Sequence, residues 1–348
     1  MNNSSSVSRS KYPAWLTSVL IVLGVIALVW TLGVTVFRDA LEERGLPEEI
    51  RGSSAEQFAL WQYGTRLADL AGRAEALSQH AHEQSAEQLQ ALHESLANGA
   101  ALLGEVRTAS TGQVSPSPES DEATKALANE VLALNEQPVA AQLDGEAASL
   151  IVRVAFATSL EARAVILAED PQTDELEFTI PSSASPQDAA DPTMGAAPLS
   201  CLSNPALLEP GQPMSAEVDT APVRAARALD RGYALDYVLQ LQAARGDSEA
   251  ATSIEAERRD LNDRLAAIRT VFAEDCSDLR QLAYDLPEGS LDNLAQLSAQ
   301  LERDFVNELL SATALTSAEA RSTLASTVWQ MLATQPADSP ARDLLATQ

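Results

Sequence analysis

The stretch VRAARALDRGYALDYVLQLQAA (Val223–Ala244) sets the fold of the C-terminal half of the chain. A stripe of apolar side chains recurs at helical spacing, so these side chains lie on one face of an α-helix. These side chains are Ala226, Leu229, Tyr233, Tyr237 and Leu241. The polar segment RGDS follows and ends the pattern. The stretch therefore predicts an amphipathic helix whose apolar face needs partner helices.

Three segments downstream supply those partners, at about Ala250–Glu274, Leu291–Ser311 and Ser317–Thr334. Each carries an apolar stripe at helical spacing, and polar loops separate them. Four amphipathic helices in one segment predict a four-helix bundle over residues 223–334. Residues 335–348 are polar and contain two prolines, so we expect a disordered tail.

Upstream, residues 38–169 predict a first helical bundle. Its expected helices run from about Ala55 to Ala76, then to about Leu103, and over Ala123–Asn135 and Ala147–Ala168. The last of these is apolar nearly all round, so it should lie centrally. Between the bundles, residues 170–222 hold nine of the seventeen prolines, which is typical of a linker. LEFTI (Leu176–Ile180) is the β-like signal in this linker.

Near the N-terminus, Ala14–Phe37 contains no charged residue over 24 positions. As a helix this segment would be about 36 Å long, enough to cross a bilayer with some tilt. Arg9 and Lys11 precede it, so residues 1–13 are expected in the cytoplasm and the rest outside. A cleaved signal peptide and a lipoprotein both fit less well, because no small-residue cleavage site is obvious and the first cysteine is Cys201.

The composition narrows the possible partners and fold classes. The net charge of −27 disfavours binding to nucleic acid, because a strongly acidic surface repels phosphates. Aromatic residues make up 4% of the chain, which favours helices over sheets. We therefore expect an all-α protein with a single membrane anchor.

Residues Val223–Leu332 resemble an uncharacterised ferritin-like domain family, a domain of unknown function in actinobacterial envelope proteins and lipoproteins. The resemblance rests on RALDRGYALDYVLQ, EAERRDLNDRL, AYDLP and QLERDF, in this order. It implies a ferritin-like bundle located in the cell envelope, and it supplies no known reaction. The first bundle is similar to the companion bundle that often precedes such a domain. The expected architecture is therefore a transmembrane helix and two ferritin-like four-helix bundles joined by a Pro-rich linker.

A ferritin-like di-metal site needs carboxylates on two helices and Glu-x-x-His on the other two. The matching positions are degenerate: Asp230, Glu255, Arg258, Glu302, Glu319 and Ser322. No histidine follows His93, so we expect no bound metal and no cofactor. One hypothesis places Arg258 inside the bundle, paired with Asp230 and Glu302 in place of the metal ions. The alternative is that Arg258 reaches the bundle edge and solvent.

Each of two groups of titratable residues in the first bundle is either a weak metal patch or a set of exposed polar positions. His80, Glu83 and Glu87 share a helix face, as do His93 and Glu94, and we interpret these residues as exposed polar positions rather than a metal patch.

Cys201 and Cys276 are the two cysteines, and they either form a disulfide that pins the linker to the second bundle or stay as free thiols.

Motifs for nucleotide binding, serine hydrolysis, zinc proteolysis and dithiol redox chemistry do not occur in the sequence. The expected function is therefore a non-catalytic scaffold or accessory subunit, anchored in the lipid bilayer through Ala14–Phe37, with an unidentified envelope protein as partner. The alternative is a degenerate ferritin-like domain that binds a metal or small ligand around Asp230, Tyr233, Tyr237 and Glu302.

Overall fold

The computed structural model describes most of the chain beyond residue 53. The described ranges are 54–104, 120–136, 143, 145–173, 178–182, 198–202, 204–208, 219–316, 318–336 and 339–346. Within them the regular structure is helical, apart from an isolated β-bridge, which confirms the all-α class. The expected anchor lies outside these ranges, and no helix inside them is long and apolar enough to cross a membrane. The chain divides at residue 57, and both bundles belong to the unit 58–348, with helix α2 beginning just before it.

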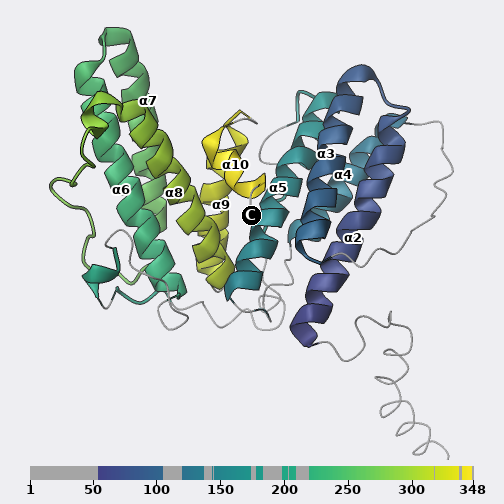
Figure 1. Cartoon of the computed structure of the whole chain (residues 1–348), viewed down its shortest axis with the longest axis horizontal. Helices are drawn as coiled ribbons and strands as arrows, with labels where there is room; N and C mark the ends of the chain where they lie inside the picture. Colours follow the sequence, from purple (N-terminus) through teal and green to yellow (C-terminus); the bar gives the residue numbers. More distant parts are fainter. Residues whose placement is uncertain are drawn as a thin grey trace, which may run out of the picture. The chain divides into compact units, whose positions relative to one another are not determined.

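The first bundle consists of four helices that pack in a ring. These are α2 (Ala55–Ser78), α3 (Glu83–Leu102), α4 (Ser120–Glu136) and α5 (Gly145–Glu169). Helices α3 and α4 both pack on α5. A ring nitrogen of His93 lies 2.9 Å from the Ala71 carbonyl oxygen and joins α3 to α2, while Tyr63 of α2 donates to Asn135 of α4. Figure 1 shows these helices side by side.

The contacts also fix the directions of these helices. Tyr63 near the start of α2 meets Asn135 near the end of α4, and Arg73 meets Glu130 further along α2, so α2 and α4 are antiparallel. Asn135 also contacts Thr158 of α5, and Lys125 pairs with Asp170 just beyond the end of α5, so α5 is antiparallel to α4. Because α2 and α3 form a hairpin, the order is up, down, down, up.

The second bundle repeats this arrangement. Its helices are α6 (Ala221–Arg245), α7 (Ser248–Arg269), α8 (Leu294–Leu315) and α9 (Ala318–Ala333). Helix α6 packs on α7 and α8, and α9 packs on the same two helices. Gln242 contacts Ser298 and Arg224 contacts Glu308, so α6 and α8 are antiparallel. Both bundles therefore share one order of helix directions and neighbours.

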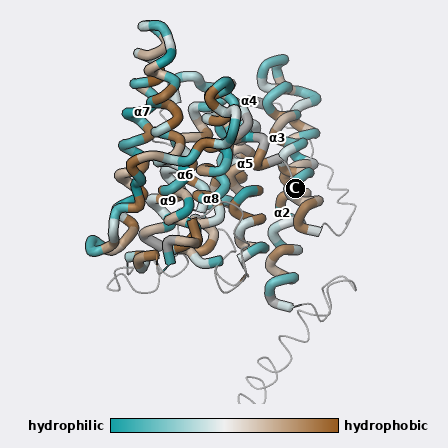
Figure 2. Tube along the Cα trace, turned by 60° about the vertical axis from the view of Figure 1, so that its left-hand side comes forward, coloured by the Kyte–Doolittle hydropathy of each residue, from teal (hydrophilic) through white to brown (hydrophobic). Residues whose placement is uncertain are grey.

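The amphipathic pattern explains why these segments are helical. Figure 2 shows apolar and polar residues alternating along the helices of both bundles. Helix α5 is apolar over most of its surface and buries residues on several faces, among them Ile151, Phe156 and Val165. It packs on α3 and α4 and also on α8 of the second bundle, so its apolar surface is covered from both bundles, and it is not central within its own ring of helices as expected.

Three expectations about boundaries need correction. Helix α7 ends at Arg269, not at Glu274, because the backbone of residues 271–273 pairs with Leu199. Of the β-like segment, residues 178–180 are described and are not a strand, and the guanidinium of Arg163 lies 5.6 Å from the centre of the Phe178 ring. The tail contains a helix, α10 (Pro340–Ala346), whose Ala341 is buried. Helix α10 packs on α5 and α8, so burial of its apolar side orders residues whose composition suggested disorder.

Candidate functional site: the crossover seam of the second bundle

The connection between α7 and α8 (residues 270–293) runs back along α6. It begins at the C-terminal end of α7 and reaches the other end of α6, where Arg245 donates to the Leu291 carbonyl oxygen at 2.5 Å. Along this path Arg280 lies over the ring of Tyr233, with 4.6 Å from the guanidinium carbon to the ring centre. The rings of Tyr237 and Tyr284 are 6.0 Å apart. We call this region the crossover seam, and its members are Asp230, Tyr233, Asp236, Tyr237, Arg258, Asn262, Arg280, Gln281 and Tyr284.

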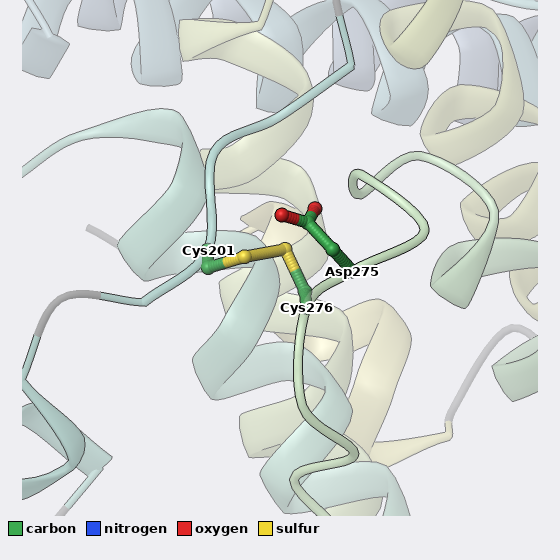
Figure 3. Close-up of side chains that lie close together, drawn as sticks. All are labelled: Cys201, Asp275 and Cys276. Atoms are coloured by element: carbon green, nitrogen blue, oxygen red, sulfur yellow. A yellow bond between two sulfur atoms is a disulfide. The ribbon is translucent and has the colours of Figure 1, made fainter.

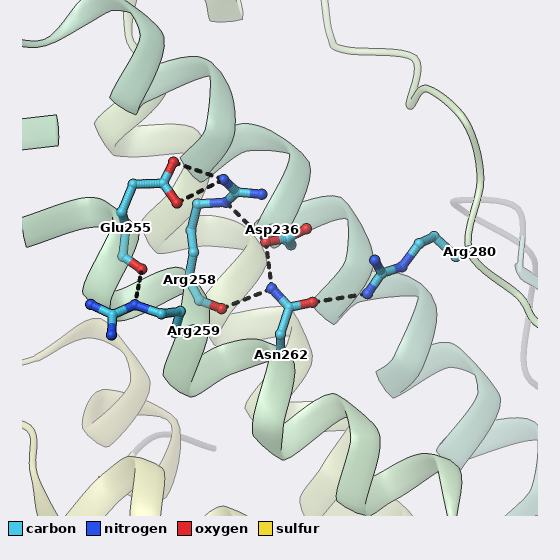
Figure 4. A network of polar contacts seen from close by, with 6 residues as sticks. All are labelled: Asp236, Glu255, Arg258, Arg259, Asn262 and Arg280. Carbon is cyan, nitrogen blue, oxygen red and sulfur yellow. Dashed lines mark hydrogen bonds and ion pairs between the residues drawn. The ribbon is translucent and has the colours of Figure 1, made fainter. Parts of the chain in front are cut away.

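A network of hydrogen bonds ties the seam together (Figure 4). The Arg258 Nε donates to Asp236 Oδ1 at 3.0 Å, and Asn262 Nδ2 donates to the same oxygen at 2.9 Å. The Asn262 Oδ1 accepts from Arg280 Nη2 at 2.9 Å. Helix α6, helix α7 and the connection are therefore linked through one chain of polar contacts.

The charged side chains of the seam are balanced by neighbouring opposite charges and by hydrogen bonds. Burial raises the pKa of Asp230, against the opposing effects of Arg231 and of a 3.4 Å hydrogen bond from Gln281. Burial also raises the pKa of Tyr284 to about 12. For Arg258 burial acts to lower the pKa, but its hydrogen bonds and attraction to Asp236 and Glu255 outweigh this effect and the pKa rises. The ionised Arg258 is thus stabilised where it is, and Tyr284 stays protonated at neutral pH.

The hypothesis that Arg258 pairs with Asp230 and Glu302 is wrong. Arg258 pairs with Asp236 and, at 2.9 Å, with Glu255, and its side chain is 18% exposed. The periodicity placed Arg258 on the inner stripe of α7, but the residue occupies the edge of that stripe that faces α6. The alternative, in which Arg258 meets only solvent, is also wrong because two carboxylates contact it.

The other degenerate positions do not gather around one point. Glu302 accepts a hydrogen bond from Gln335, and burial followed by repulsion from Glu257 raises its pKa. Ser322 is exposed, and the side chain of Glu319 lies outside the described residues. In the described part of the chain, Asp230, Glu255 and Glu302 do not form a group close enough to share an ion. Asp230, Tyr233 and Tyr237 do belong to one cluster, but Glu302 is not in it.

The space between the helices near these positions is filled by apolar side chains. A Cβ atom on Gly232 would lie 2.4 Å from Leu265 Cδ2 and 3.2 Å from Phe305 Cε2. Leu265 and Phe305 are both fully buried. Helices α6, α7 and α8 thus approach closely around Gly232, two residues from Asp230.

The histidines of the first bundle lie on its surface or bind backbone. His80 contacts the Ala76 carbonyl oxygen at 3.1 Å, and His82 is exposed. Glu83 and Glu87 are exposed beside them, and Glu94 is exposed next to His93. The interpretation of these residues as polar surface positions fits their exposure.

A buried polar network inside the first bundle was not predicted from the sequence. Asn135 accepts from the Tyr63 hydroxyl at 2.7 Å and donates to Thr158 Oγ1 and Ser159 Oγ, both at 2.8 Å. The Asn135 carbonyl oxygen also accepts from the Ser182 backbone nitrogen at 3.0 Å, which ties the linker to the bundle. A signal was present in the sequence, since Asn135 continues the inward stripe of Leu127 and Val131.

The two cysteines form a disulfide in the structure, with 5.1 Å between their Cα atoms (Figure 3). Cys201 is exposed and Cys276 is largely buried. The bond pins linker residues 198–202 to the segment after α7, beside the β-bridge of Leu199 and Phe272. The short helix η4 (Pro205–Leu208) is held to the same bundle, because Arg227 donates to the Leu207 carbonyl oxygen at 2.7 Å.

Comparison with known proteins gives no relative for this chain. No family model, no curated protein and no solved structure matches it.

Proposed function

We propose that this protein is a non-catalytic scaffold or accessory subunit of the cell envelope, held by a single membrane anchor at Ala14–Phe37 and carrying two ferritin-like bundles outside the cytoplasm. The proposal rests on the crossover seam, whose polar side chains bind one another and the neighbouring helices. Arg258 pairs with Asp236, and Asn262 joins this pair to Arg280, which holds the connection against α6 and α7. Groups used in this way stabilise a rigid body and are not poised as the acid or base of a catalytic site.

The helix order supports the ferritin-like part of the proposal. Ferritin-like folds combine four helices with one long crossover connection. In the second bundle the connection of residues 270–293 has this role, and the first bundle has the same order of directions. The contact of Arg153 with Asn307 and the packing of α10 on α5 and α8 join the two bundles. A body of this size and stiffness suits a docking role.

The first experiment tests the anchor. A reporter enzyme that is active only outside the cytoplasm is fused after Gln348. In a separate protein the same reporter is inserted after Lys11, with the rest of the chain kept behind it. We expect activity from the first fusion and none from the second, with the full-length fusion resisting extraction by carbonate. The control replaces Leu20 and Ile26 with arginine, which costs about 3 kcal/mol per residue in a membrane-spanning helix and should release the protein. Activity from the Lys11 fusion would overturn the orientation.

The second experiment tests the scaffold role. The oxidised full chain is purified in mild detergent, its metal content is measured by elemental analysis, and its assembly size is measured before and after transfer to a harsher detergent. We expect no stoichiometric metal and an assembly larger than the chain that dissociates in the harsher detergent. Stoichiometric iron or manganese that Glu302→Gln removes would favour the ligand-binding alternative instead.

A further inference from the structure

Linker residues 198–202 and the segment that follows α7 are held together by backbone as well as by sulfur. The Leu199 nitrogen donates to the Val271 carbonyl oxygen at 2.8 Å, and the Ala273 nitrogen donates to the Leu199 carbonyl oxygen at 3.1 Å. These two bonds lie two residues from Cys201 and three or more from Cys276. They involve no sulfur atom, so we expect them to keep the two cysteines near each other when the sulfur bond is open.

A third side chain completes the group. Figure 3 shows the carboxylate of Asp275 beside the disulfide. The two Sγ atoms and a carboxylate oxygen of Asp275 all lie within 4.8 Å of one another. Within the described ranges, no other group of three or more His, Cys, Asp and Glu side chains comes this close. Cys201 and Asp275 are exposed, so both a thiol reagent and an ion can reach them.

We propose that the disulfide is one of two states of a redox-controlled metal site, independent of the scaffold role. A small dithiol reduces the Cys201–Cys276 bond: the dithiol becomes a cyclic disulfide, and each cysteine sulfur takes up one hydrogen. One Zn²⁺ ion then binds the two sulfurs and the Asp275 carboxylate, and the two thiol protons are released to solvent. Water fills the fourth position.

The residue types suit this ion. Zn²⁺ takes four ligands in a tetrahedron, with thiolate sulfur at about 2.3 Å and carboxylate oxygen at about 2.0–2.2 Å. These lengths place neighbouring ligand atoms under about 4 Å apart, so the three groups need little movement apart from the opening of the sulfur bond. The Arg269 guanidinium binds the Cys276 carbonyl oxygen nearby. Three anionic ligands outweigh its charge, and the divalent ion together with Arg269 leaves the group neutral.

The test uses the full chain in mild detergent. The protein is reduced with dithiothreitol, freed of reductant by anaerobic gel filtration and titrated with Zn²⁺ against a chromogenic chelator. Titration with Co²⁺ reports sulfur ligation through the thiolate charge-transfer absorption. We expect one Zn²⁺ per reduced chain and none per oxidised chain. Asp275→Asn should weaken binding to the reduced chain about tenfold or more. The matched control is Glu274→Gln, the adjacent exposed carboxylate, which should leave the affinity unchanged.

Any one of the following results would overturn the proposal. The first is equal Zn²⁺ binding by the oxidised and reduced chains, and the second is binding that survives in the double variant Cys201→Ser, Cys276→Ser. The third is a reduced chain that fails to bind the ion or loses its helical circular dichroism, because the site requires the backbone bridge to hold the open thiols. A cobalt complex without charge-transfer absorption counts against sulfur ligation in the same way.

Discussion

The two bundles share one order of helices but place their buried polar groups differently. In the first bundle, Asn135 and its partners lie between the helices, fully enclosed. In the second, apolar side chains fill the space around Gly232, and a network of polar side chains lies in the crossover seam along α6 and α7. A bundle of this topology can therefore be specified either by an internal hydrogen-bond network or by a network on its outer face.

Removal of the internal network should have the largest effect on stability. Asn135→Ala leaves the Tyr63 hydroxyl and two hydroxyls of α5 without their partner and creates a small cavity. We expect a loss of about 3 kcal/mol in the free energy of unfolding, measured by urea denaturation. Asn129→Ala, at an exposed position of the same helix, should cost well under 1 kcal/mol. Equal costs for the two variants would mean that the network does not stabilise the bundle.

The close approach of helices in the second bundle gives the next largest effect. Gly232→Ala should destabilise by about 1–2 kcal/mol, because its Cβ would collide with Leu265 in a filled core. Gly72→Ala is the matched change on α2, where a Cβ would meet nothing within 4 Å. That variant should gain about 0.5–1 kcal/mol from better helix propensity. Thermal unfolding measures both, and a stabilised Gly232→Ala protein would contradict the tight packing.

The seam itself is probed by Arg258→Met. The change leaves Asp236 with its hydrogen bond from Asn262, and the site is partly exposed, so we expect a loss of about 1 kcal/mol in urea denaturation. Arg259→Met, one residue along, removes a single bond to the Glu255 carbonyl oxygen and should change stability by less than about 0.5 kcal/mol. A stability equal to or above that of the natural protein would show that the ion pair is not required.

The smallest effect concerns pH. Burial raises the pKa of Glu302, so the folded state holds this proton more tightly than the unfolded chain does. The resulting stability is present at pH values below the unfolded pKa and is lost as the pH rises through the folded pKa. The melting temperature should therefore rise as the pH falls from neutral towards the ordinary range of carboxyl groups, and Glu302→Gln should flatten this rise. The exposed Glu249→Gln serves as the control. An identical pH profile for Glu302→Gln would rule out its contribution.

The periodicity of apolar residues predicted the helices of both bundles, because a 3.6-residue repeat is a local property of the chain. The buried network around Asn135 was not predicted, because a stripe position does not say what would satisfy a polar side chain there. The prediction of a disordered tail was wrong, and the described residues 178–180 of the β-like segment are not a strand. Composition describes a segment alone, while the order of α10 comes from packing on α5 and α8.

Local sequence was enough to establish the all-α class, the acidic composition and the presence of two cysteines that could meet. The pairing of side chains, in contrast, came from the packing of the helices. Arg258 could reach acids on either side of α7, and the rotation of that helix against α6 selected Asp236 over Asp230. The direction of α8 and the path of residues 270–293 brought Arg280 and Gln281 to the seam. Such pairings depend on helix rotation and chain direction, which no local pattern encodes.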